Sequence, residues 1–365
     1  MNIKWNFDEN TLQCFESLAC IISPSMEEVA MSTNLKNKWQ EHGLDISSDV
    51  MGNIHATMLA NKEDKSTVLN LGMVAHMDTV AVQITNILPN GMLQFRSIGL
   101  QPHTLLGQPM KVLTNNGVIS GVVGFDPTSQ YGQPKGLVLD DLWLDIGAKS
   151  CDDARQLVEV GNLAVLEPRF EEMENNYLCG TGIDDRIGLF VLNECIMWFA
   201  EHSVPVNLHF IGTVQEELGL RGANTAIANL PLDACIVIDV DYATDTPASH
   251  ENQMGSLSLG RGVGLHAKAD NNPVLRRIAK EVAIKERIPY QITLGRFTYG
   301  GTDVSPLQIQ NGGVATLNVN IPCRYMHSPV EMCHKSDIES AIRLIISLVE
   351  ELGAHQQKSF IPGID

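Results

Sequence analysis

Four short runs of aliphatic and β-branched residues constrain the fold of this chain more than any other feature of its sequence. Each run is continuous rather than alternating, which is typical of strands buried on both faces of a sheet. Helical patterns separate the runs, and this alternation favours an α/β fold with a mostly parallel sheet sandwiched by helices. We expect strands at 67–75, 206–214, 234–240 and 314–319, and helices at about 12–19, 29–39, 186–201, 219–229, 273–287 and 335–352.

The stretch from 81 to 175 has a different pattern. Its short alternating segments are separated by turn sequences, as in a small β-barrel or sandwich. A chain of 365 residues also exceeds the roughly 250 to 300 residues at which single cores stop growing. We therefore predict an α/β domain formed by 1–80 and 176–365, and a β-rich domain inserted at 81–175. The turn sequences are Pro89-Asn90-Gly91, Asn115-Asn116-Gly117 and Gly132-Gln133-Pro134.

Charge and cysteine usage exclude several classes of protein. The formal charge of -18 opposes binding to nucleic acid or to an anionic membrane surface, so neither is expected as a partner. The eight cysteines stand singly, without a C-x-x-C pair, which indicates a reducing compartment. We find no secretory signal pattern and no apolar segment long enough to span a bilayer. We expect a cytoplasmic protein.

Histidine and acidic side chains stand where the expected strands leave the sheet, the edge at which open α/β sheets bind ligands. Each residue alone has an ordinary explanation, such as a helix N-cap, a solvated strand end, a turn or an incidental histidine. Carboxylates in apolar strand contexts are nevertheless costly to bury unless they are paired or bind a cation. The residues are His76 after 67–75, Asp184-Asp185 at a helix start, Glu216-Glu217 after 206–214, and Asp239 near the end of 234–240.

A second histidine, His327, follows the last expected strand and completes the set. Two histidines and three acidic groups form a mixed nitrogen and oxygen donor set. Such a set suits Zn²⁺, Co²⁺ or Mn²⁺ and is too rich in nitrogen for Ca²⁺. Five ligands exceed the needs of one tetrahedral catalytic site. The sequence therefore predicts two divalent metal ions per chain, with Zn²⁺ preferred, that share a carboxylate.

These segments resemble a known family, the cytosolic dinuclear metallo-aminopeptidases of metallopeptidase family forty-two. The family includes glutamyl and deblocking aminopeptidases, carries some endoglucanase-like descriptions, and assembles as tetrahedral dodecamers. The resemblance extends over nearly the whole chain. The matching segments are Ala75-His76-Met77-Asp78, Gly107-Gln108-Pro109, Ile146-Gly147-Ala148-Lys149-Ser150, Asp184-Asp185-Arg186, Gln215-Glu216-Glu217, Asp239-Val240, Ala243-Thr244-Asp245-Thr246-Pro247, Gly300-Gly301-Thr302-Asp303 and Arg324-Tyr325-Met326-His327-Ser328-Pro329-Val330-Glu331.

The resemblance implies a zinc-exopeptidase-like fold and a homo-oligomer, expected to be a tetrahedral dodecamer, in which the insert at 81–175 makes subunit contacts. It also implies a cis peptide bond between Asp184 and Asp185. It further implies how the metal ligands are divided between two ions. Asp184 would bridge the ions, His76 and Asp239 would complete one site, and Glu217 and His327 the other.

Two catalytic roles are implied as well. Glu216 would be the general base, and Asp78 would orient the imidazole of His76. Two cations would lower the pKa of a bridging water, and Glu216 would transfer the water proton to the leaving amine. Because neighbouring residues of a regular strand face opposite ways, Glu216 and Glu217 can share one site only if the strand ends between them.

The expected activity is therefore hydrolysis of N-terminal residues from peptides. Three segments depart from the family pattern and affect substrate preference rather than the metal site: the early loop 22–27 lacks glycines, Asp241-Tyr242 replaces a Thr-His pair, and Gly262-Val263 replaces Gly-Pro.

Three alternative functions remain open. One is another dinuclear-metal amidohydrolase, such as a carboxypeptidase or deacylase, although these usually carry a different insert. A glycosidase needs no histidines, and a non-catalytic metal-stabilised assembly protein needs no general base.

Overall fold

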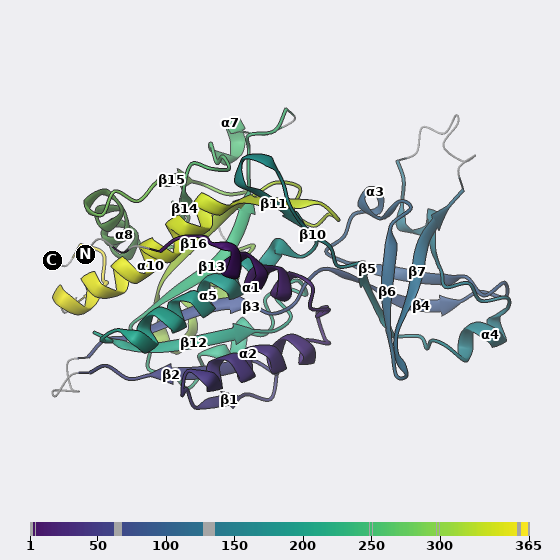
Figure 1. Cartoon of the computed structure of the whole chain (residues 1–365), viewed down its shortest axis with the longest axis horizontal. Helices are drawn as coiled ribbons and strands as arrows, with labels where there is room; N and C mark the ends of the chain where they lie inside the picture. The colour runs from purple at the N-terminus through teal and green to yellow at the C-terminus, as the bar shows by residue number, and fades with distance from the viewer. Residues whose placement is uncertain are drawn as a thin grey trace.

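The computed structural model describes residues 3, 5–61, 68–126, 136–247, 249, 251–296, 298, 300–355 and 359–363. It contains a large α/β unit and a smaller β-barrel beside it (Figure 1). The α/β class and the inserted barrel are thus confirmed. One expected turn, Gly132-Gln133-Pro134, lies outside the described residues.

The α/β unit is built on an eight-stranded mixed sheet. Its centre is parallel, because β12, β3, β13 and β16 run in the same direction. The sheet turns antiparallel where β2 pairs with β12 and where β14 pairs with β16. The continuous apolar runs therefore correspond to the buried central strands. The strand order is β1 (Ile46–Ser48), β2 (Ile54–Met58), β12 (Asn207–Thr213), β3 (Asn70–His76), β13 (Ala234–Tyr242), β16 (Ala315–Cys323), β14 (Val263–His266) and β15 (Tyr290–Thr293).

Helices cover both faces of this sheet. The larger core lies under α1 (Glu9–Ala19), α2 (Val29–Glu41), α5 (Ile183–Glu201), α8 (Pro273–Lys285) and α10 (Lys335–His355). The opposite face packs against the short helices α6 (Ala223–Ala226) and α9 (Val304–Gln308).

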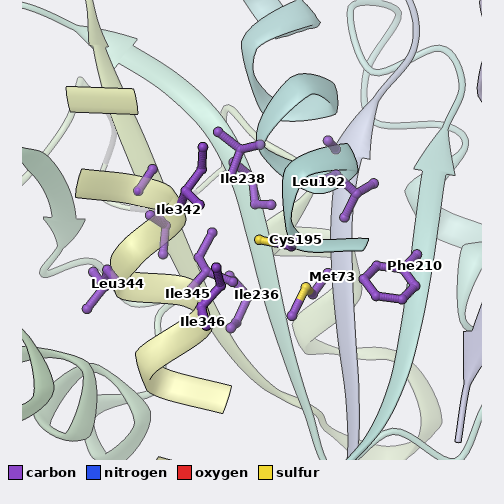
Figure 2. Close-up of a cluster of buried hydrophobic side chains, with 14 of the residues drawn as sticks. Met73, Leu192, Cys195, Phe210, Ile236, Ile238, Ile342, Leu344, Ile345 and Ile346 are labelled. Carbon is purple, nitrogen blue, oxygen red and sulfur yellow. The ribbon is translucent and has the colours of Figure 1, made fainter. Parts of the chain in front are cut away.

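The centre of the larger core shows why α5 and α10 form where they do. Leu192 and Cys195 of α5 and Ile342 and Ile345 of α10 pack against strand residues such as Ile236 (Figure 2). Apolar residues surround α5 on nearly all sides, as expected of a helix that is enclosed by the protein. Among the described residues, no helix is long and apolar enough to cross a membrane.

Six strands close the barrel, in the order β4 (Ala81–Ile87), β5 (Leu93–Ile98), β8 (Leu142–Asp145), β7 (Gly117–Phe125), β6 (Pro109–Thr114) and β9 (Leu163–Leu166). The barrel has a hydrophobic cluster of its own and carries the short helices α3 (Pro102–Leu105) and α4 (Cys151–Arg155). Asn115 and Asn116 form the expected tight turn, because Thr114 pairs directly with Gly117.

A small third sheet was not expected from the sequence. It consists of β10 (Phe170–Glu172), β11 (Tyr177–Gly180) and β17 (Glu331–His334). β10 pairs with β11 and so belongs to this third sheet, whereas β9 pairs with β6 and is the last strand of the barrel. The predicted domain boundary at 175 therefore falls after β10, beyond the end of the barrel. The exact domain boundaries remain a prediction.

One expected helix is largely wrong. The interval 219–229 contains only the single-turn α6, preceded by turns. Gly219 has φ 93° and Leu220 has φ 61°, and both values are incompatible with a right-handed helix. The apolar spacing that suggested a helix instead serves a loop, in which Leu220 N–H donates to the carbonyl of Glu216 at 2.8 Å. A last short helix, α7 (Glu251–Met254), lies near β15 in Figure 1.

Candidate metal centre and active site

The carboxyl ends of the central strands bring the first group of predicted ligands together. His76 is the last residue of β3, and Asp239 lies near the end of the neighbouring β13. Nε2 of His76 lies 3.9 Å from an Asp239 carboxylate oxygen and 2.9 Å from Asp184 Oδ1. All three residues are buried, and each offers one donor atom within 4.8 Å of the others. We call this group the strand cluster.

A second group shares Asp184 with the first. Nε2 of His327 lies 3.2 Å from Asp184 Oδ2 and 3.2 Å from Glu217 Oε2. Glu217 belongs to the loop after β12, and His327 to the loop after β16, so we call Asp184, Glu217 and His327 the loop cluster. The five predicted ligands thus fall into two groups that share Asp184, and the division of these residues between two ions stays a prediction. The expected cis peptide between Asp184 and Asp185 is also present.

The free ring nitrogen of each histidine has an oxygen partner. Nδ1 of His76 lies 3.1 Å from the backbone oxygen of Asp78 and 3.5 Å from its carboxylate. Nδ1 of His327 lies 3.2 Å from the backbone oxygen of Gly99, which follows barrel strand β5. An Nδ1–H that donates to such an oxygen leaves Nε2 as the lone-pair donor toward a cation. The partner of His76 is thus chiefly a carbonyl of Asp78, where a carboxylate was expected.

Glu216 and Glu217 both lie beyond the end of their strand. β12 ends at Thr213, and Gln215 has φ 54°, so the chain turns before the two glutamates. The strand therefore ends earlier than the sequence argument supposed. Both side chains can approach the same site for that reason, and both line one cavity of about 370 Å³.

This cavity begins at the two clusters and extends beyond them. Its lining also includes Tyr242, His266, Lys268 and Arg296. Asp241, one of the departures from the family pattern, lies 2.7 Å from Nε2 of His266. The cavity is large enough to take part of a small ligand, and it joins the acidic clusters to a wall that also carries cationic side chains.

The pKa shifts of the cluster residues indicate that the two clusters lack positive charge. Burial, together with neighbouring carboxylates such as Glu217 and Asp239, raises the pKa of Glu216 well above its ordinary value. Burial similarly raises the pKa of Asp239. Burial opposes protonation of His327, but Glu217 and Asp184 override it and raise its pKa. Burial also opposes ionisation of Asp184, yet hydrogen bonds from the two histidines lower its pKa. These shifts are those of carboxyl groups crowded together in a buried site, and a divalent cation would offset their charge.

One buried oxygen atom without a partner also supports a cation at this site. Oε1 of Glu217 is buried and has no hydrogen-bond partner within the described part of the chain. A buried carboxylate oxygen without a partner is costly. A cation bound in the loop cluster would supply that partner.

Sequence reasoning assigned no role to three residues that hold the site. Glu331 accepts from Asp184 N–H at 3.1 Å and from His327 N–H at 2.8 Å, so it fixes the backbone of two predicted ligands. Asp185 accepts from His76 N–H at 3.3 Å. The Gly99 carbonyl had no sequence signal, because any residue carries a carbonyl. Glu331 and Asp185 stand inside the matching segments, and Asp185 was also among the acidic side chains expected at the sheet edge, so a signal for both was present although neither was given a role.

An α/β sheet that gathers histidines and carboxylates at the ends of its parallel strands defines a class of α/β proteins with a candidate metal centre at the sheet edge. Within that class, residues 52–344 match the family model described as M42 glutamyl aminopeptidase, and the chain therefore belongs to this aminopeptidase family. It is thus a peptidase, a hydrolase that acts on peptide bonds.

Individual relatives agree with this assignment. The chain is 32% identical over 320 residues to the lysyl aminopeptidase of Pyrococcus furiosus, a match covering 85% of this chain and 90% of that relative. A solved aminopeptidase from the archaeon Desulfurococcus kamchatkensis is similar with a TM-score of 0.89 at 28% identity, covering 97% of this chain and 98% of the other. A Pyrococcus horikoshii TET peptidase, described as able to assemble into a tetrahedron or a large octahedral shell, gives a TM-score of 0.81 at 29% identity, covering 93% and 99%.

Proposed function

We propose that this protein removes N-terminal residues from peptides with two divalent metal ions and a glutamate general base. The observation that carries the proposal is the pair of clusters that share Asp184 next to Glu216 at one cavity. In this proposal His76 and Asp239 hold one ion, Glu217 and His327 hold the other, and Asp184 binds both.

The donor set fits such ions. Each cluster offers one imidazole nitrogen and two carboxylates, a set that suits Zn²⁺ first and Co²⁺ or Mn²⁺ second. Three protein ligands per ion also leave a position open for water or substrate, as catalytic sites require.

Bound ions would supply Lewis acidity, which lowers the pKa of a water and offsets charge on the scissile carbonyl oxygen. Glu216 then accepts the proton of the attacking water and transfers it to the nitrogen of the leaving amine. The cavity of about 370 Å³ holds the N-terminal residue. Asp78 positions the reacting groups, because its carboxylate accepts from Glu216 N–H at 2.9 Å and from Glu217 N–H at 3.1 Å.

We further propose that the protein is cytoplasmic and forms a homo-oligomer, a tetrahedral dodecamer in which the insert at 81–175 makes subunit contacts. The eight free cysteines support a reducing compartment. The assembly described for the Pyrococcus horikoshii relative supports the oligomer. Light scattering across a wide concentration range, with metal present, would contradict the oligomer by showing monomers only.

The function is tested on the full chain after chelation and reloading with Zn²⁺, Co²⁺ or Mn²⁺ separately. We expect two ions per chain by metal analysis, hydrolysis of aminoacyl-arylamides with a free amino group, and loss of hydrolysis on chelation. N-acylated amino acids and peptides with blocked N-termini serve as matched comparisons. Hydrolysis of the blocked substrates alone would instead identify a deacylase or a carboxypeptidase, and at most one tightly bound ion would refute the two-metal centre.

A further inference from the structure

The N-terminal loop 23–28 lies outside the residues that match the family model, which begin at position 52. In the structure this loop nevertheless lies against the active site. Ser23 Oγ donates to the backbone oxygen of Met77 at 2.8 Å, and Ser25 N–H donates to that of Thr79 at 3.2 Å. The loop is therefore attached to the segment that follows His76.

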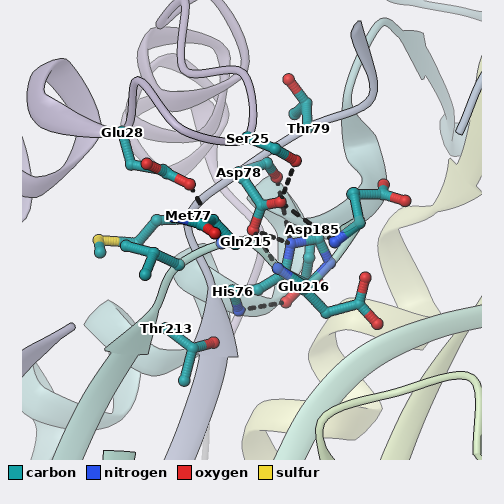
Figure 3. A network of polar contacts seen from close by, with 12 residues as sticks. Ser25, Glu28, His76, Met77, Asp78, Thr79, Asp185, Thr213, Gln215 and Glu216 are labelled. Carbon is teal, nitrogen blue, oxygen red and sulfur yellow. Dashed lines mark hydrogen bonds and ion pairs between the residues drawn. The ribbon is translucent and has the colours of Figure 1, made fainter. Parts of the chain in front are cut away.

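The carboxylates of Glu28 and Asp78 accept hydrogen bonds from three consecutive backbone N–H groups, those of residues 215–217 (Figure 3). Oε1 of Glu28 accepts from Gln215 N–H at 3.1 Å, and Asp78 accepts from the next two N–H groups. Ser25 Oγ donates to the same Asp78 carboxylate at 2.5 Å. The conformation of residues 215–217 is thus fixed jointly by the N-terminal loop and by the segment after β3.

The contact made by Glu28 falls on the residue that most needs support. Gln215 has φ 54°, a left-handed value that is unfavourable for a residue with a side chain. Glu28 is 7% exposed, and its Oε1 also accepts from Met26 N–H at 3.0 Å. One buried carboxylate oxygen therefore joins the turn of its own loop to the turn that precedes the general base.

We propose that Glu28 is a positioning residue for peptide hydrolysis: it holds the Gln215 turn and thereby places the carboxylate of Glu216. This inference rests on the proposed role of Glu216 as base. Glu28 touches neither cluster, so its effect should be transmitted through the backbone of residues 215 and 216.

The exposed neighbour Glu27 offers a matched control, since its replacement removes the same charge from the same loop. We expect Glu28→Ala to lower kcat by about 10 to 100-fold, the range found when a supporting contact of a catalytic group is removed. KM and metal content should stay as in the unaltered chain, and Glu27→Ala should retain full activity. Glu28→Gln should recover most of the loss, because its amide oxygen can accept both N–H groups. Burial and the nearby Asp78 raise the pKa of Glu28 to about 7, so a neutral side chain suits this place.

A double-mutant cycle and hydrogen exchange distinguish the proposed positioning role of Glu28 from a merely structural role. If Glu28 acts through Glu216, then adding Glu28→Ala to Glu216→Gln should cost little further kcat. An equal fold-loss in both backgrounds would overturn the proposal, as would equal losses for the Ala and Gln variants. Mass-spectrometric exchange should show faster exchange in peptides spanning 213–219 for Glu28→Ala only. This measurement needs no substrate, so it tests the contact even if the chain proves not to be an aminopeptidase, and unchanged exchange would also refute the inference.

Discussion

The two clusters of the candidate site share Asp184 but are built in different ways. In the strand cluster, the imidazole of His76 is 2% exposed, and sheet hydrogen bonding fixes β3 and β13, the strands that carry His76 and Asp239. In the loop cluster, the side chain of His327 is 25% exposed and lies on a backbone with φ 61°. Its placement depends on individual hydrogen bonds that His327 donates to the Glu331 carboxylate and to the Gly99 carbonyl. A sheet places a ligand by cooperative pairing, whereas a loop needs a separate support for each residue, so we expect the loop cluster to bind its ion more weakly.

The largest expected effect separates base from ligand. Glu216→Gln should lower kcat by about 10² to 10⁴-fold, since an amide keeps the shape but cannot accept the water proton. Both ions should remain bound by metal analysis. Glu217→Gln instead removes an anionic ligand, so the loop cluster should lose its ion, and excess metal should restore part of the activity. If Glu216→Gln loses metal and Glu217→Gln keeps it, the two roles are reversed.

The next effect concerns stability without metal. Burial raises the pKa of Glu331 to about 8 and that of Asp303 to about 6, and it also raises the pKa of Asp239. These groups bind more protons in the folded than in the unfolded chain. Their stabilising contribution is therefore complete below the ordinary carboxyl pKa and is lost as the pH rises through the folded values. The raised pKa of His327 acts in the same direction.

We therefore expect the chelated protein to become less stable between pH 5 and pH 8, by several kcal/mol in the free energy of unfolding, since each pKa unit is worth about 1.4 kcal/mol. Urea unfolding at several pH values, with chelator and with Zn²⁺, measures this dependence. Zn²⁺ should flatten the curve because cations replace the protons. A chelated protein whose stability does not change with pH would show that the clusters are not short of positive charge.

A smaller effect tests the support that the barrel gives to the loop cluster. A Cβ added at Gly99 would meet Val80 at 2.3 Å and Glu217 Oε2 at 3.3 Å, and φ is 79°. Gly99→Ala should displace the carbonyl that accepts from His327 and weaken the second ion by about 10 to 100-fold, as outer contacts of metal ligands do. Gly107→Ala is the control, because φ there is 69° and nothing lies within 4 Å. Equal affinities in competition titrations with a chelator would contradict the role of Gly99.

The smallest effect is expected in the N-terminal loop 23–28, which holds the turn at Gln215 before the two glutamates. Met26 has φ 82°, a left-handed value that favours glycine, and its side chain is 38% exposed. Met26→Gly should relieve left-handed strain, partly offset by glycine entropy, for a net gain of up to about 1 kcal/mol. Met173→Gly is the comparison, because this methionine is similarly exposed at 44% but has φ -106°. Chemical unfolding of both variants decides the point, and a loss of stability in Met26→Gly would contradict it.

The sequence predicted the strand-borne half of the molecule better than the loop-borne half. β3 and β13 were identifiable because a strand buried on both faces must be a continuous apolar run, and the ligand then follows at its end. His327 and Glu217 were also candidates because they follow expected strands, but which of Glu216 and Glu217 binds metal could be assigned only by resemblance, since nothing in their spacing shows which way a loop turns. The helix expected at 219–229 failed for that reason, because the left-handed Leu220 is not encoded in the apolar pattern. The Gly99 carbonyl could not have been found, because backbone contacts between distant segments leave no residue-type signal.

The barrel begins at β4, shortly after His76, and ends at β9, from which β10 and β11 lead to Asp184, so the chain enters the barrel from one predicted ligand and returns to another. For protein engineering, this removes the usual option of trimming the insert to obtain a minimal enzyme. Any splice would have to join the chain at the sheet edge where the clusters lie, and it would delete the Gly99 carbonyl that accepts from His327. For the same reason, a barrel grafted from a relative carries part of the donor's hydrolytic machinery with it. Its success should depend on the path of residues 98–100 more than on the barrel surface.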